Sequence, residues 1–66
     1  MIIKINGKEE EVKVPMNLAA LVASRHLKPE AIVVEHNFQI VPHAAWKDIH
    51  LNENDTVEIV SFVGGG

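Results

Sequence analysis

Three consecutive glycines, Gly64, Gly65 and Gly66, are the residues best suited to chemistry in the active site of a partner. Glycine costs more backbone entropy to order than any other residue, and a run without side chains has nothing to pack. Such a tail can pass through a narrow channel and present a carboxylate. A carboxylate is a poor electrophile, but an acyl-adenylate has a good leaving group that a sulfur donor can displace. A frayed end or a linker has the same composition, so the glycines alone leave both interpretations open.

The other residues offer little further chemistry. The sequence has no cysteine, which excludes thiol nucleophiles, iron–sulfur ligation and disulfides. The spacing of the histidines matches no zinc motif, and no serine or lysine stands with a matching base for nucleophilic catalysis. We therefore expect surface histidines, no bound metal and no bound cofactor. The four histidines are His26, His36, His43 and His50.

Length and charge narrow the class of protein. A chain of 66 residues has room for one small domain, and a large ligand pocket would consume most of its core. The net charge of −3 and the few aromatic residues argue against a nucleic-acid binder, which needs a basic patch. No apolar run could span a membrane, and no basic start precedes an apolar segment as in a signal peptide. We therefore expect a cytoplasmic protein.

The apolar pattern predicts five strands and one helix. Asn6 and Gly7 give a two-residue hairpin signal between the first two strands. Asn17 is placed to cap a helix over residues 18–27, and a helical turn over residues 43–49 carries Trp46. The strands are predicted at residues 1–5, 10–14, 31–35, 38–41 and 56–63.

Three details of these elements can be tested against a structure. The run at residues 31–35 is nearly all apolar, which is typical of a strand buried on both faces. His36 and Asn37 are expected to form the turn that follows it. Trp46 is expected to cover one end of the core rather than to recognise a partner.

This order of elements predicts an α+β protein with a ubiquitin-like β-grasp fold. A mixed sheet of four or five strands would wrap around the helix, with the helical turn beside it. The last strand would run parallel to the first in the middle of the sheet, as the apolar strands at both ends of the chain require. We expect a single domain over residues 1–63 and a flexible tail over residues 64–66.

The last strand also suggests a docking surface. If Glu58 points to water, Val60 and Phe62 lie on its side of the strand, and Val57 and Ile59 point inward. With Ile2 expected beside them on the neighbouring strand, Ile2, Val60 and Phe62 would form an apolar patch that leads into the tail. The alternatives are that a loop covers Phe62 or that the register of the strand is flipped.

The chain resembles the ThiS-type sulfur carriers of thiamine biosynthesis. The matching segments are residues 2–8 (IIKINGK), 33–37 (VVEHN), 40–42 (IVP) with Trp46, and 55–66 (DTVEIVSFVGGG). Together with the order of elements they cover nearly the whole chain. The glycine ending is the most specific part, since the strands alone would fit any small β-grasp protein.

The resemblance implies a function for the tail. An E1-like enzyme would adenylate Gly66 with ATP, a cysteine desulfurase or another sulfur donor system would supply sulfur, and thiazole synthase would receive it. Gly64 and Gly65 would form the narrow part of the tail that passes into the partner's active site. The chain would be a co-substrate rather than an enzyme. Two positions depart from the family pattern: His43 stands where many relatives have a basic residue, and Asn54 where glycine is common, although asparagine tolerates the left-handed conformation.

Two other functions stay open at this point. A molybdopterin-type sulfur carrier has the same fold and glycine ending, but tends to be longer. A non-catalytic β-grasp binding module would be a fragment with an arbitrary end. A free α-carboxylate at Gly66 favours a carrier, whereas an encoded continuation favours the module. A β-grasp ferredoxin is excluded because the chain has no cysteine.

Overall fold

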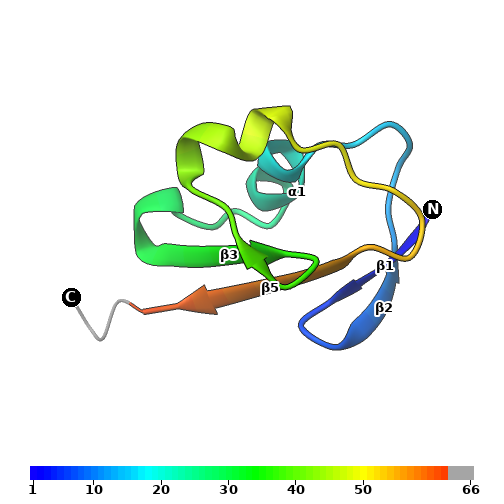
Figure 1. The fold of residues 1–66 in the computed structure, drawn as a ribbon, viewed down its shortest axis with the longest axis horizontal. Coiled ribbons are helices and arrows are strands. Elements are labelled where there is room, and N and C mark those ends of the chain that lie inside the picture. The colour runs from blue at the N-terminus through cyan, green and yellow to red at the C-terminus, as the bar shows by residue number, and fades with distance from the viewer. Residues whose placement is uncertain (63–66) are drawn as a thin grey trace.

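The structure, a computed structural model, describes residues 1–62. Its strands are β1 (Ile2–Ile5), β2 (Lys8–Glu11), β3 (Ile32–His36), β4 (Gln39–Ile40) and β5 (Thr56–Ser61). Its helices are α1 (Leu18–Ser24) and the 3₁₀ helices η1 (Pro29–Ala31) and η2 (His43–Asp48). The N-terminus and the end of β5 lie at opposite ends of the molecule (Figure 1).

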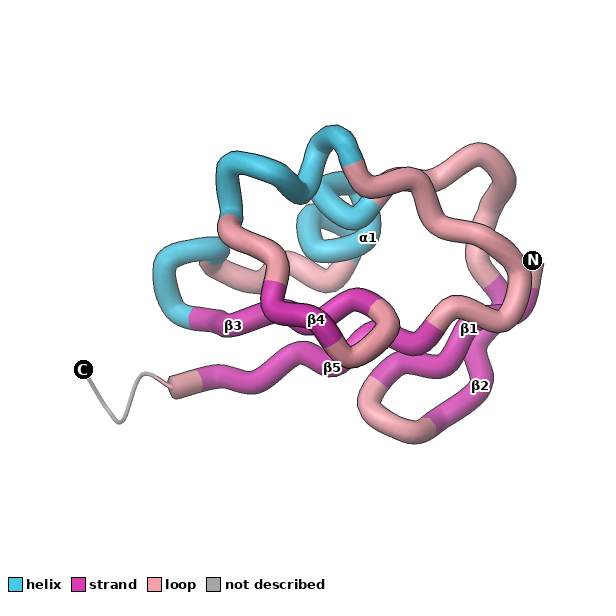
Figure 2. The backbone as a smooth tube through the Cα atoms, viewed as in Figure 1, coloured by secondary structure: helices cyan, strands magenta, loops and turns pink. Residues whose placement is uncertain are grey.

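The strands form one mixed sheet in the order β2-β1-β5-β3-β4. β5 lies in the centre, parallel to β1 and antiparallel to β3, and the two hairpins are antiparallel. Helices α1 and η2 lie on the same side of this sheet (Figure 2). The predicted β-grasp fold, with its last strand parallel to its first, is confirmed. The face of the sheet away from α1 is called the outer face below.

The core lies between the sheet and α1. Trp46 is only 3% exposed, and its Nε1 donates a hydrogen bond to the Val41 carbonyl at 2.8 Å. Its predicted place in the core is therefore confirmed. The buried apolar residues are Ile3, Ile5, Leu18, Leu21, Val22, Ile32, Val34, Trp46, Leu51 and Val57.

The first hairpin has the predicted turn but a different second strand. Asn6 and Gly7 have φ values of +52° and +84°, as a two-residue hairpin requires. This turn places Ile5 opposite Lys8 and Ile2 opposite Glu11. The predicted strand at residues 10–14 is therefore wrong, because a two-residue turn starts β2 at Lys8, and the strand ends at Glu11.

Helix α1 is shorter than predicted. Asn17 is its N-cap, and the Asn17 Oδ1 accepts a hydrogen bond from the Ala20 N–H at 2.7 Å. The helix ends at Ser24, and His26 takes a left-handed conformation with φ +58°. The prediction of helix to residue 27 is wrong because a left-handed residue cannot continue a right-handed helix.

The second hairpin turns one residue later than predicted. β3 includes His36, and the turn residues are Asn37 and Phe38, with φ values of +49° and +72°. The prediction that this strand is buried on both faces is also wrong, because Val33 is 36% exposed on the outer face. In the turn before β5, Asn54 has φ +70°, so asparagine does support the conformation expected there.

Candidate functional site

The candidate site combines the outer face near the end of β5 with the glycine tail. Gly64, Gly65 and Gly66 lie outside the described residues, as does Val63. The structure therefore describes the surface that leads to the tail, up to Phe62.

The predicted register of β5 is confirmed. Val57 is fully buried, whereas Val60 is 53% exposed and Phe62 is 58% exposed. Val60 and Phe62 lie on the outer face because side chains alternate along a strand. The Phe62 N–H donates to the Ala31 carbonyl at 3.1 Å, which holds this end of the strand against the start of β3. Both alternatives, a loop over Phe62 and a flipped register, are excluded by these exposures.

The predicted position of Ile2 is wrong. The parallel register places Lys4 beside Thr56, and the Asn54 N–H donates to the Ile2 carbonyl at 2.8 Å. Ile2 is thus level with Asn54, about 20 Å along the strand from Val60 at roughly 3.3 Å per residue. Ile2 is only half-buried, but it does not join Val60 and Phe62 in one patch. A contact of Ile2 with a partner stays a prediction, and it would involve a separate surface.

Two apolar residues of the second hairpin take the place expected for Ile2. Val33 lies directly opposite Val60, and Ile40 lies opposite Glu35 and is 68% exposed. The outer-face patch is defined here as Val33, Ile40, Val60 and Phe62. The sequence offered one signal for the exposure of Val33. Val33 and the charged Glu35 are two residues apart, which places both side chains on the same face of the strand.

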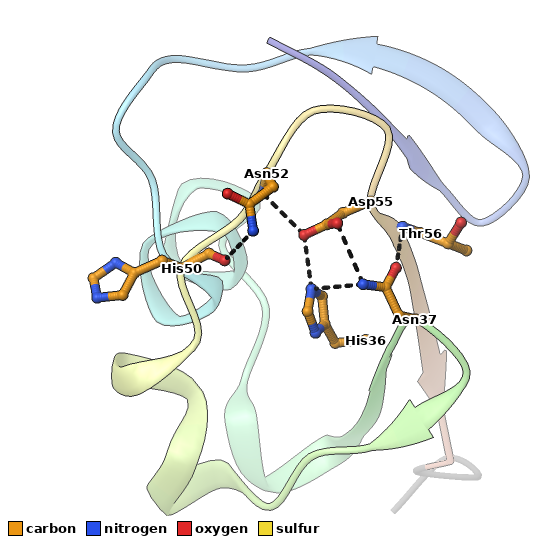
Figure 3. A network of polar contacts seen from close by, with 6 residues as sticks. All are labelled: His36, Asn37, His50, Asn52, Asp55 and Thr56. Carbon is orange, nitrogen blue, oxygen red and sulfur yellow. Dashed lines mark hydrogen bonds and ion pairs between the residues drawn. The ribbon is translucent and has the colours of Figure 1, made fainter.

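A polar network fixes the start of β5 (Figure 3). The Asp55 Oδ2 accepts hydrogen bonds from His36 Nε2 at 2.8 Å and from the Asn52 N–H at 2.9 Å. The Asp55 Oδ1 accepts from Asn37 Nδ2 at 3.2 Å, and the Asn37 Oδ1 accepts from the Thr56 N–H at 2.9 Å. These bonds join the β3–β4 turn to the turn before β5, so the strand that leads to the tail starts from a fixed point.

The network also changes the acidity of Asp55. Burial alone would raise the pKa of this carboxyl group. Its hydrogen bonds from His36, Asn52 and Asn37, together with the charge attraction of His36, outweigh burial and lower the pKa below its ordinary value. Asp55 therefore stays ionised in the folded protein at neutral pH.

Two of the histidines make side-chain contacts within the folded domain. His36 binds Asp55, and the His43 ring lies 4.6 Å from the Trp46 ring at an angle of 47°. Within residues 1–62, no three His, Asp or Glu side chains gather in a way that could hold a metal ion.

A groove of about 280 Å³ beside Arg25 and Ser61 lies just below the usual size range of ligand pockets. In the same range of residues, no helix is long and apolar enough to cross a membrane.

Comparisons with known proteins agree on one family. The ThiS family model matches residues 3–66. Sulfur carrier protein ThiS of Bacillus subtilis is 34% identical over 65 residues, a match that covers 97% of this chain and 98% of the relative. A crystal structure of a thiamine biosynthesis protein (ThiS) from Geobacter metallireducens matches with a TM-score of 0.85 and 28% identity, over 100% of both chains.

Longer proteins contain a similar segment. Thiazole synthase of Paramagnetospirillum magneticum is 36% identical over 62 residues, which are 94% of this chain but 19% of that protein. For thiazole synthase of Magnetococcus marinus, the match covers 20% of the relative. The chain thus spans about a fifth of the length of these two relatives. Because the family model matches nearly the whole sequence and the Bacillus relative matches almost end to end, the chain belongs to the ThiS family.

Proposed function

We propose that this chain is a sulfur carrier in thiamine biosynthesis and that Gly66 carries the sulfur. The observation that supports this most directly is the family match, which extends through the three glycines to residue 66. The exposed Val60 and Phe62, on the strand that leads to those glycines, give a partner a surface to hold.

The chemistry would take place at the carboxylate of Gly66. One carboxylate oxygen attacks the α-phosphate of ATP, and pyrophosphate leaves. A hydrosulfide then attacks the acyl carbon, and AMP departs with that oxygen, so that sulfur replaces oxygen at the acyl group. If the donor supplies a persulfide instead, the acyl disulfide that forms is cleaved by a thiol, which is itself oxidised to a disulfide with the donor. The resulting thiocarboxylate donates its sulfur for thiazole formation. Gly64 and Gly65 would give the tail the narrow, adaptable shape that entry into an active site requires.

Each of these steps needs a partner. We assign adenylation to an E1-like enzyme that binds ATP, sulfur supply to a cysteine desulfurase or another donor system, and sulfur acceptance to thiazole synthase. The chain itself would be a co-substrate that binds no cofactor, in the cytoplasm. The assignment of thiazole synthase draws support from the two thiazole synthases that contain a segment similar to this chain.

Intact mass spectrometry tests the proposal. The purified chain is incubated with ATP, an E1-like enzyme and a sulfur donor, and its mass is compared with that of a sample without ATP. We expect an increase equal to the difference between sulfur and oxygen, located at Gly66 by fragmentation. A chain that lacks Gly66 is the matched control and should stay unchanged. A plain carboxylate in every sample would refute the proposal and favour a non-catalytic binding module.

A further inference from the structure

The outer-face patch borders two acidic side chains. Glu35 on β3 and Glu58 on β5 lie directly opposite each other, two residues along each strand from Val33 and Val60. Ile40 lies on the other side of Glu35. Both glutamates are half-buried. Directly opposed residues in a sheet have Cβ atoms roughly 5 Å apart, and like charges at that spacing destabilise the sheet.

Within residues 1–62, no cation forms an ion pair with Glu35 or Glu58. Among residues 1–62 the ion pairs are Arg25 with Glu10, His36 with Asp55, and Lys47 with Asp48. The closest cation by register is Lys4, which lies beside Thr56 and opposite Glu9, one row away from Glu58. Glu35 and Glu58 therefore have no ion-pair partner in this part of the chain, and they lie at the border of an exposed apolar surface.

We propose that the outer-face patch binds a surface of thiazole synthase that places a basic side chain over Glu35 and Glu58, with apolar groups around it. This inference rests on the proposed function and adds the chemistry of the docking surface. An arginine suits the position best, because its planar guanidinium can donate to two carboxylates at once. Val60 and Ile40 beside the pair would reduce the access of water to that contact, which strengthens the attraction.

The charge also argues for a protein surface rather than a lipid surface. An anionic membrane would be repelled by the two glutamates and by the net charge of −3. A basic protein surface would gain from both. In the free chain, Glu35 and Glu58 repel each other. In the complex, one cation bound to both carboxylates would offset that repulsion.

Titration calorimetry with the full chain and the thiazole synthase of the same organism tests this inference. Glu58→Gln removes one charge at nearly constant shape. We expect the dissociation constant to rise about tenfold or more, and added salt to weaken wild-type binding more than binding of this variant. We also expect the melting temperature to hold or to rise by about 1–4 °C, because a like-charge pair is removed. A group that only stabilised the fold could not produce both changes.

Two further variants make the test decisive. Glu35→Lys creates an opposite-charge pair with Glu58, so it should keep or raise the melting temperature and weaken binding more than Glu58→Gln does. Asp48→Asn makes the same charge change as Glu58→Gln on the covered side of the sheet, where its side chain is 72% exposed, and should leave binding unchanged.

Each outcome separates the inference from the proposed function. The inference would be overturned if the wild-type chain binds but Glu58→Gln weakens binding by less than about twofold, no more than Asp48→Asn does. The proposed function would then still stand. No wild-type binding would also overturn the inference, and the mass measurement on Gly66 would then decide the proposed function independently.

Discussion

Replacement of Asp55 by alanine measures how strongly the polar network holds the start of β5. The carboxylate accepts three hydrogen bonds, from His36 Nε2, the Asn52 N–H and Asn37 Nδ2. Asp55 is only 9% exposed, so water cannot readily replace those bonds. A hydrogen bond to a charged group contributes about 1.5–3 kcal/mol, and donors left unsatisfied add a desolvation cost.

These terms give a magnitude for the loss of stability. Because the three bonds share one carboxylate and are not additive, we expect Asp55→Ala to lower the free energy of unfolding by about 3 kcal/mol rather than by the sum of three bonds. In a domain of this size, 3 kcal/mol lowers the melting temperature by roughly 12–24 °C. Thermal unfolding followed by circular dichroism measures this value. Asp48→Ala, an acidic residue with an exposed side chain, is the control.

The pH dependence provides a second measurement on the same residue. Because the folded pKa of Asp55 is lowered, its contribution is fully present above the unfolded pKa of about 3.9 and is lost as the pH falls through the folded pKa. The difference in stability between wild type and Asp55→Ala should therefore be constant near neutral pH and shrink below about pH 4. A difference no larger than that of Asp48→Ala, or one that persists unchanged into acid, would refute this account of the network.

Three further substitutions test other parts of the structure by binding and thermal unfolding. Phe62→Ala should weaken binding to thiazole synthase but cost no more than about 1 kcal/mol of stability, because Phe62 is 58% exposed; a large fall in melting temperature would identify it as a core residue. Asn17→Ala removes the N-cap of α1 and should cost about 1 kcal/mol, and a neutral result would contradict the capping role. Phe38→Gly should raise stability by a few tenths of a kcal/mol or more, since Phe38 is 78% exposed and has φ +72°; a loss of stability would show that its side chain supports the turn.

Features encoded by adjacent residues were predictable from the sequence. Asn6 and Gly7 predict their own turn because both must accept positive φ, and Asn17 predicts its cap because its side chain reaches the Ala20 N–H. The alternation around Glu58 correctly placed Val60 and Phe62 on the outer face. The order of elements was sufficient to predict the β-grasp fold with β5 beside β1.

Features set by distant residues were not predictable in the same way. The turn length fixes the register of a hairpin, but fifty residues of chain separate the parallel strands β1 and β5, so no local signal fixes how far they are offset. Ile2 was misplaced for this reason. Val33 was missed because its exposure depends on which face α1 covers. The end of α1 was also not predictable, because the left-handed residue after the helix is His26 and not the glycine that usually marks such a position.

The two faces of β5 separate the stability of the fold from the binding of a partner. Val57, on the covered face, is fully buried and belongs to the core, whereas Val60, three residues later on the outer face, is 53% exposed. The network at Asp55 fixes one end of the strand, and the bond from the Phe62 N–H to Ala31 fixes the other. The surface next to the tail is therefore already ordered before a partner arrives, and docking need not bear the entropy cost of ordering it. On the proposed function, binding energy gained on this surface would be available to hold Gly64, Gly65 and Gly66 in a partner's active site, because glycine is the residue type whose backbone costs most to fix.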